Sequence, residues 1–278
     1  MTRDKAQRSL GLLGGVAGGV LRFAAAYILL YQLRVPQLLS NKLSLVAREA
    51  SVSGAKLAEA RLSALMGMFV ADKRMLALLA ASVAAWVVGG RLLSRAWRSL
   101  TRFWGRGTRL ALFALNVVST LFWVLALVAL LAPILANVSA DLPYLRTLAG
   151  IARSLDAALV AFMLSALTPF AASLLNMREA RSVTGRHASI LLALGSLLYA
   201  LAAIILYLTW RSYSRTLIRG LGAGFRLDAE TVSRLLSLFA ALFAALTNVL
   251  KLVLVASLLL SLGFLGAWLD YRRASRGM

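Results

Sequence analysis

The chain contains no cysteine, a single histidine and only 10 acidic residues among its 278 positions. Without cysteine there are no disulfides, no thiolate nucleophiles and no cysteine-ligated metal sites. His187 lies in the basic segment Arg186-His187-Ala188 without a carboxylate beside it, so we expect a surface position rather than a metal ligand or a catalytic base. The sequence therefore predicts neither a bound metal nor a cofactor.

The sparse acids also argue against an enzyme. Most lie close to an arginine or in a polar segment, as in Arg178-Glu179, where a solvated ion pair is expected. The cluster Gly220, Gly222 and Gly224 lacks the Lys-Ser/Thr of a phosphate-binding loop. No pair of carboxylates lies inside an apolar run, as a proton relay would require. We expect a non-enzymatic protein.

Apolar residues and arginine dominate the rest of the composition. Hydrophobic residues make up 61% of the chain, and the mean hydropathy is +0.82, values that indicate an integral membrane protein. Of the 31 basic residues only five are lysine, and the formal net charge is +21. Because the arginines flank apolar runs, we expect anionic lipid headgroups as partners, and no nucleic acid.

The apolar runs predict an all-α, polytopic helical membrane protein with about four to six membrane-embedded helices. The run from Leu235 to Leu269 would be about 50 Å long as a helix, so either a break near Asn248 to Lys251 or an interfacial first half is expected. Pro169 predicts a kink or a re-entrant segment. The runs are 10–33, 75–90, 110–131, 157–176, 188–210 and 235–269, with a neutral loop over 132–156.

The chain divides into an N-terminal region, 1–74, and a membrane-embedded domain, 75–278. In the first apolar run, glycines at 11, 14, 15, 18 and 19 have the small-x-x-x-small spacing that permits close helix contact. Residues 34–74 are polar and predict an extramembrane stretch that begins at Pro36. Within it Leu57, Leu62 and Leu65 recur at near-helical intervals, which predicts an amphipathic helix.

An arginine stripe is the most distinctive sequence feature. Its members are spaced so that they share one face of a helix, and no acid interrupts them. The opposite face carries Trp97, Phe103 and Trp104, so we predict an interfacial amphipathic helix that binds anionic lipid through both faces. The stripe consists of Arg91, Arg95, Arg98, Arg102, Arg106 and Arg109.

Part of this motif recurs at an offset of 113 residues. Trp97-Arg98-Ser99 with Arg102 and Arg106 corresponds to a second segment that consists of Trp210, Arg211, Ser212, Arg215 and Arg219. Both copies lie between apolar runs, which predicts two hairpins, 75–132 and 188–269, each made of two apolar helices joined by a basic interfacial connector. Duplication and coincidence explain the pattern equally well.

Four polar residues interrupt apolar runs, and they suggest the rival hypothesis of a solute transporter or channel. Arg22, Asn116, Asn248 and Lys251 would then face inward, although a snorkelling Lys251 is the preferred interpretation. A third hypothesis is an accessory subunit of a larger membrane complex, docked to other membrane proteins through the arginine stripe.

The chain resembles the peroxin-11 family of peroxisomal and glycosomal membrane-elongation proteins. The similar features are the start Arg3-Asp4-Lys5 with Arg8, the basic amphipathic region, the segment from Asn116 to Trp123, and the closing basic tail of Arg272, Arg273 and Arg276. The resemblance implies that amphipathic helices insert into one leaflet and elongate the organelle membrane before fission, with self-association. It implies a peroxisomal or glycosomal membrane, and a mitochondrial membrane is the alternative.

Overall fold

The computed structural model describes residues 3–104, 143–180, 182–220 and 228–276, together with the single positions 121, 124, 125, 128 and 132. Within these residues the secondary structure is helical and contains no strand. The all-α, polytopic architecture expected from the apolar runs is confirmed. Five helices of the described part are long and apolar enough to cross a membrane.

The chain begins with α1 (Arg3–Tyr27), which continues into one π-helical turn, η1 (Ile28–Gln32). The amide of Leu33 closes this turn on the carbonyl of Ile28 at 2.9 Å. Arg34 then adopts a left-handed conformation with φ of 48°, and Pro36 lies in the first turn of α2 (Val35–Ser53). Because proline lacks an amide hydrogen and fixes φ, it suits this first turn.

Residues 34–74 form two helices rather than one polar stretch with a single helix. Gly54, with φ of 80°, separates α2 from α3 (Ala55–Ala71). The predicted apolar side of α3 is confirmed at Leu62 and Leu65, which are buried, whereas Leu57 is exposed. The carboxylate of Asp72 accepts the amides of Arg74 and Met75 at 3.0 Å each and so caps the next helix.

That next helix, α4 (Lys73–Trp104), is continuous. It joins the uncharged run 75–90 to the first four members of the arginine stripe. Residues 91–104 therefore continue the preceding helix and do not form a helix of their own, which the hairpin prediction required. Arg106, Arg109, Asn116 and most of the apolar run 110–131 lie outside the described residues.

Helix α6 spans Pro143–Glu179 and contains Pro169. The prediction of a loop as far as residue 156 is wrong, because the helix already begins at Pro143. Proline leaves the carbonyl of Ser165 without its usual helical donor, and the hydroxyl of Thr168 donates to that oxygen at 2.8 Å. This replacement bond lets the helix continue through Pro169, so residues 157–176 do not form a re-entrant loop.

The last two helices are α7 (Val183–Gly220) and α8 (Ala229–Arg276). The break predicted near Asn248 to Lys251 is absent from α8, which is helical throughout. At 1.5 Å per residue α8 is about 70 Å long, whereas a bilayer with its headgroups measures about 40–45 Å. A helix of this length either protrudes from a bilayer or runs obliquely to it.

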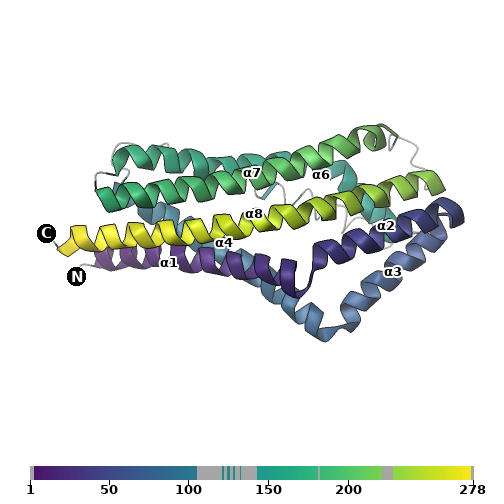
Figure 1. Ribbon diagram of the computed structural model, residues 1–278, viewed down its shortest axis with the longest axis horizontal. Helices are drawn as coiled ribbons and strands as arrows, with labels where there is room; N and C mark the ends of the chain where they lie inside the picture. Colours follow the sequence, from purple (N-terminus) through teal and green to yellow (C-terminus); the bar gives the residue numbers. More distant parts are fainter. Residues whose placement is uncertain are drawn as a thin grey trace.

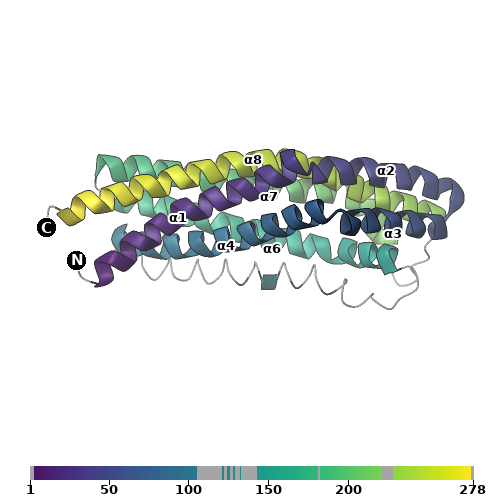
Figure 2. The same cartoon turned by 90° about the horizontal axis from the view of Figure 1, so that it is seen from below.

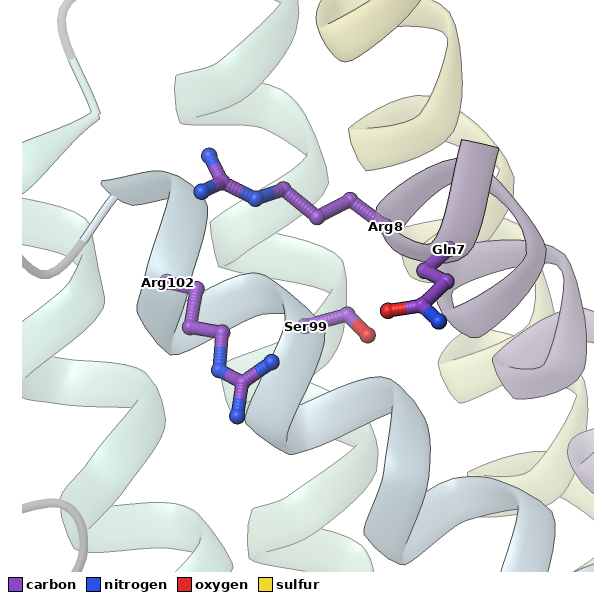
Figure 3. Close-up of a pocket in the computed structure, with 4 residues that line it drawn as sticks. All are labelled: Gln7, Arg8, Ser99 and Arg102. Atoms are coloured by element: carbon purple, nitrogen blue, oxygen red, sulfur yellow. The ribbon is translucent and has the colours of Figure 1, made fainter. Parts of the chain in front are cut away.

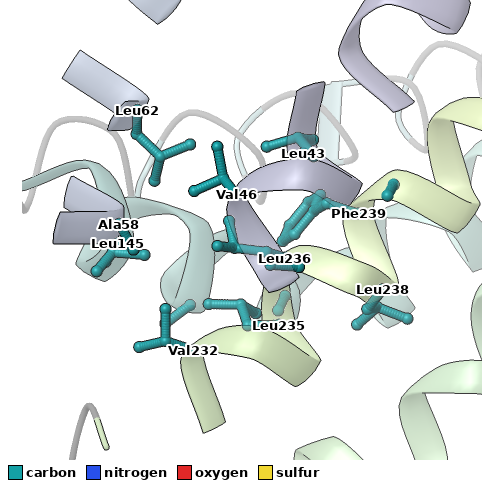
Figure 4. Packing of buried hydrophobic residues seen from close by; sticks show 14 of the residues in the cluster. Leu43, Val46, Ala58, Leu62, Leu145, Val232, Leu235, Leu236, Leu238 and Phe239 are labelled. Atoms are coloured by element: carbon teal, nitrogen blue, oxygen red, sulfur yellow. The ribbon is translucent and has the colours of Figure 1, made fainter. Parts of the chain in front are cut away.

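Helix α8 forms the axis of the bundle, and α1, α2 and α7 lie along it (Figure 1). Both chain ends lie at one end of the bundle, while α2 and α3 lie at the other (Figures 1 and 2). A core around Trp210, Leu236 and Phe239 joins α2, α3 and α6 to the first half of α8 (Figure 4). A second core around Leu100, Leu192 and Phe264 joins α1, α4 and α7 to its second half.

The glycines of α1 permit close helix contact, as their spacing predicts. A Cβ atom added to Gly15 would lie 2.4 Å from Phe264 Cγ of α8 and 2.7 Å from Ala96 Cβ of α4. A Cβ atom added to Gly18 would lie 2.7 Å from the Gly89 carbonyl oxygen. Helix α1 is thereby inserted between α4 and α8, which positions the arginine-bearing face of α4.

Candidate functional site

The arginine stripe is solvent-accessible along the end of α4. Arg91, Arg95, Arg98 and Arg102 are all exposed, while Leu93, Ala96 and Leu100 between them are buried. The predicted separation of a cationic face from an apolar face is therefore confirmed for the described residues. Arg102 lies one turn from the end of α4, where a cation also complements the helix dipole.

The aromatic residues of the same segment pack against protein. The Trp97 ring meets Phe264 edge-on at 5.3 Å between ring centroids, and Phe103 meets Tyr271 at 5.2 Å in the same way. Trp104 is 6% exposed. The sequence predicted that these three rings insert among lipid headgroups, whereas in the structure they hold α4 against α8. We assign them a structural role and leave lipid contact to the arginines.

The end of α4 is also tied by polar contacts centred on Asp270 of α8. Asp270 is buried, and its carboxylate accepts the indole N–H of Trp104 at 3.2 Å and the hydroxyl of Ser182. The Ser182 oxygen in turn accepts the amide of Gly185 at 2.8 Å, which caps α7. We call Trp104, Ser182, Gly185 and Asp270 the Asp270 cluster. It fixes α4, α7 and α8 to one another beside the arginine stripe.

At the same level of the bundle, other helices expose apolar side chains. Phe264 of α8 contacts Trp97 of α4, so the part of α8 around Phe264 lies beside the arginine stripe. The exposed side chains of this part of α8 include four leucines. Leu258, Leu262, Leu265 and Leu269 are between 37% and 51% exposed. This half of the bundle is therefore amphipathic, with cations along α4 and leucines along α8.

The extent of the stripe constrains how this half meets a membrane. From Arg91 to Arg102 α4 advances about 17 Å, whereas each headgroup layer is about 5–8 Å thick. With α4 perpendicular to the bilayer and the uncharged run 75–90 in the hydrocarbon, Arg91 would lie among the headgroups and Arg102 in the water beyond them. The stripe is compatible with headgroups along its whole length only when α4 runs close to the membrane plane.

The second copy of the motif lies in a different setting. Trp210 is fully buried and contacts Phe239 at 6.2 Å between ring centroids. Arg211 is exposed and donates to the Tyr207 hydroxyl at 2.7 Å. Arg215 and Arg219 belong to α7, but their side chains lie outside the described set. Like the first copy, this segment continues a long helix, so neither copy is a separate interfacial connector within the described residues.

Three of the residues predicted to line a pore are described, and the structure does not bring them together. Asn248 and Lys251 are exposed on the outside of α8. Arg22 instead points into the bundle, with its guanidinium carbon 5.2 Å from the Trp86 ring centre and 5.5 Å from that of Tyr199. A Cβ atom on Gly90 would lie 2.8 Å from a terminal nitrogen of Arg22, so this glycine provides the space for the side chain.

Two acids have structural roles that were not predicted from the sequence. Glu59 is 9% exposed, and its carboxylate accepts the amides of Tyr144 and Leu145 at 2.8 and 2.9 Å. It therefore caps the start of α6 from another helix. Asp270 lies at the end of a long apolar run, and this position was the one feature of the sequence that could have indicated its structural role. Ion pairing with a neighbouring arginine is the usual expectation for such acids, but both bind hydrogen-bond donors from distant segments.

The described residues contain no group of three or more His, Cys, Asp or Glu side chains that could hold a metal ion. The site that the structure describes is a cationic surface held in place by aromatic packing and the Asp270 cluster. No family model, no curated protein and no solved structure matches the chain, so the assignment of function depends on these residues alone.

Proposed function

We propose that this integral membrane protein is non-enzymatic, binds anionic lipid headgroups along α4 and thereby shapes or elongates the membrane that contains it. The observation that carries the proposal is the exposed line of Arg91, Arg95, Arg98 and Arg102. Guanidinium groups bind phosphate through paired hydrogen bonds. Each contributes roughly 1 kcal/mol near an anionic surface.

The leucine face of the same half supports a wedge mechanism. With α4 against the headgroups, Leu258, Leu262 and Leu265 of α8 would reach the acyl chains of the same leaflet. A body inserted into one leaflet expands that leaflet relative to the other and favours curvature. Self-association, which the family resemblance implies, would concentrate such wedges.

The decisive experiment compares two variants with equal losses of charge. One replaces Arg91, Arg95, Arg98 and Arg102 by glutamine, and the control replaces the exposed Lys42, Arg48, Lys56 and Arg74. Both are reconstituted into phosphatidylcholine liposomes with and without phosphatidylserine, and vesicle shape is recorded by electron cryomicroscopy. We expect wild type and control to elongate the anionic vesicles and the stripe variant to leave them round. Equal behaviour of the two variants would refute the proposal.

Imaging of a tagged copy tests the location and the cellular role together. The family resemblance leads us to expect a peroxisomal or glycosomal membrane that lengthens when the protein is in excess. A mitochondrial location would be compatible with the lipid-binding proposal but would contradict the expected organelle.

Two further experiments test the rival hypotheses. Solute flux in proteoliposomes that disappears in Lys251→Leu would favour a transporter. Co-purification of stoichiometric partners in mild detergent would favour an accessory subunit.

A further inference from the structure

A polar notch opens between α1 and α4 beside the end of the arginine stripe. Gln7 and Arg8 line it from α1, and Ser99 and Arg102 line it from α4 (Figure 3). The cavity volume is about 60 Å³. Every lining side chain carries a hydrogen-bond donor, and two of the four carry a positive charge.

The helices that form the notch are held close together. A Cβ atom on Gly11 would lie only 1.9 Å from Ser99 Oγ, so this glycine lets α4 approach α1 at the floor of the notch. One turn further along, Gly15 contacts both Ala96 and Phe264. The donors of the notch are thereby presented from two packed helices rather than from a loop.

The two arginines of the notch have no acidic partner among the described side chains. Neither the Arg61–Glu49 nor the Arg234–Glu230 ion pair includes Arg8 or Arg102. The guanidinium groups of Arg8 and Arg102 lie on different sides of the notch (Figure 3), and an anion bound between the two helices would neutralise the positive charge that they bring to it. The Ser99 hydroxyl, which donates to the Arg95 carbonyl at 3.1 Å, can rotate to donate to such an anion.

We propose that the notch is a binding site for a phosphomonoester group. A phosphomonoester carries close to two negative charges at neutral pH and has three acceptor oxygens, which match two guanidinium groups and two neutral donors. A carboxylate would neutralise only one of the arginines. This inference deepens the proposed lipid function, because Arg102 also belongs to the arginine stripe. The phosphate comes either from a lipid headgroup, such as phosphatidic acid, or from a soluble phosphate ester.

The test uses the full chain in phosphatidylcholine nanodiscs, titrated separately with dioctanoyl phosphatidic acid and with glycerol 3-phosphate. Arg8→Gln removes a notch charge that lies outside the stripe, and Ser99→Ala removes a donor without changing the charge. Arg48→Gln is the matched control, since it removes an exposed arginine charge on α2, outside both the stripe and the notch. Circular dichroism and size-exclusion chromatography identify the variants that are folded. If Arg8→Gln does not fold, the binding measured for Ser99→Ala tests the site.

We expect saturable binding of one phosphate probe per chain, weakened at least tenfold by Arg8→Gln and about threefold by Ser99→Ala, with Arg48→Gln within twofold of wild type. Tighter binding of phosphatidic acid identifies a lipid source, and equal binding identifies a soluble one. The site would be overturned by absence of saturable binding, by unchanged binding in Ser99→Ala, or by equal losses of binding in Arg8→Gln and Arg48→Gln. Vesicle elongation can fail while the saturable site remains, so the two proposals fail separately.

Discussion

The indole N–H of Trp104 donates to the buried carboxylate of Asp270 at 3.2 Å, across 166 positions of sequence. This bond joins the end of the arginine-bearing helix to the end of the axial helix. The same carboxylate accepts the hydroxyl that caps α7. Three helices therefore depend on one acid for their relative positions beside the cationic face.

Replacing this acid should destabilise the bundle. In Asp270→Ala the Trp104 indole and the Ser182 hydroxyl lose their acceptor in a buried environment, at a cost of about 1–3 kcal/mol. We expect a lower thermal unfolding temperature in detergent, measured by circular dichroism. Trp104→Phe, which removes one of the donors and keeps the ring, should show a smaller loss. An unfolding temperature equal to that of wild type in Asp270→Ala would contradict this role.

Gly185 is the second sensitive position of the Asp270 cluster. A Cβ atom there would lie 2.8 Å from Asp270 Oδ2 and 3.3 Å from Trp104 Cζ2. We therefore expect Gly185→Ala to lower stability by about 1–3 kcal/mol despite the better helix propensity of alanine. Gly67→Ala is the control, since nothing lies within 4 Å of its Cβ position, and it should raise stability by up to about 1 kcal/mol. Both are compared by thermal unfolding, and a stabilised Gly185→Ala would reject the predicted clash.

Replacement of Glu59 should destabilise the fold more than replacement of the partly exposed Glu49. Glu59→Ala leaves two amides at the start of α6 without their acceptors, for an expected loss of about 1–2 kcal/mol. Glu49 pairs with Arg61 at 3.1 Å on the surface, so Glu49→Ala should cost less than about 1 kcal/mol. Hydrogen exchange at Tyr144 and Leu145 should accelerate only in the Glu59 variant. Equal exchange in both variants would show that the cap does not protect these amides.

The contact between Arg22 and Trp86 is best measured by a double-mutant cycle. A guanidinium 5.2 Å from the ring centre should give a coupling of about 0.5–2 kcal/mol in a desolvated setting. The cycle comprises Arg22→Met, Trp86→Leu and the double variant, each followed by thermal unfolding. Additive losses would mean that the two side chains are neighbours without an energetic link.

The pH dependence of the α8 start follows from Asp228. Hydrogen bonds from the Thr231 side chain and backbone, together with the charge of Arg234, hold the pKa of the Asp228 carboxyl below its ordinary value of 3.8. A carboxyl with a lowered folded-state pKa stabilises the fold above its unfolded pKa, and this contribution disappears as the pH falls through the folded value. Wild type should therefore be more stable than Asp228→Ala well above pH 3.8, and this difference should shrink well below it. Thermal unfolding of both proteins across this range checks the sign, and a difference that grows with acidity would contradict it.

Local patterns in the sequence predicted the helical secondary structure and the charged surface of this protein. Apolar runs predicted the membrane helices, and the spacing of arginines predicted the charged face of α4. The glycines of α1 predicted close helix contact, because a helix that lacks side-chain bulk on one face can approach its neighbours. Each of these properties is decided within a few turns of one helix. The composition likewise excluded cysteine chemistry without reference to any fold.

Helix continuity could not be predicted in this way. The charges at Arg91 and Lys251 suggested ends of membrane segments, but α4 and α8 continue through both positions. A charge ends a membrane span only where it faces hydrocarbon, and the sequence alone does not give that orientation. Pro169 likewise remained ambiguous until the Thr168 hydroxyl was seen to replace the missing donor.

The sequence by itself determined that the chain is helical, apolar and cationic, because these properties follow from residue type and helical period. Only the tertiary structure decided that Trp97, Phe103 and Trp104 face α8, that Glu59 and Asp270 bind donors far away in sequence, and that Arg8 joins Arg102 in one notch. Such contacts connect helices that are distant in the chain. Their partners are selected by how the helices pack, and a pattern within one helix carries no information about that choice.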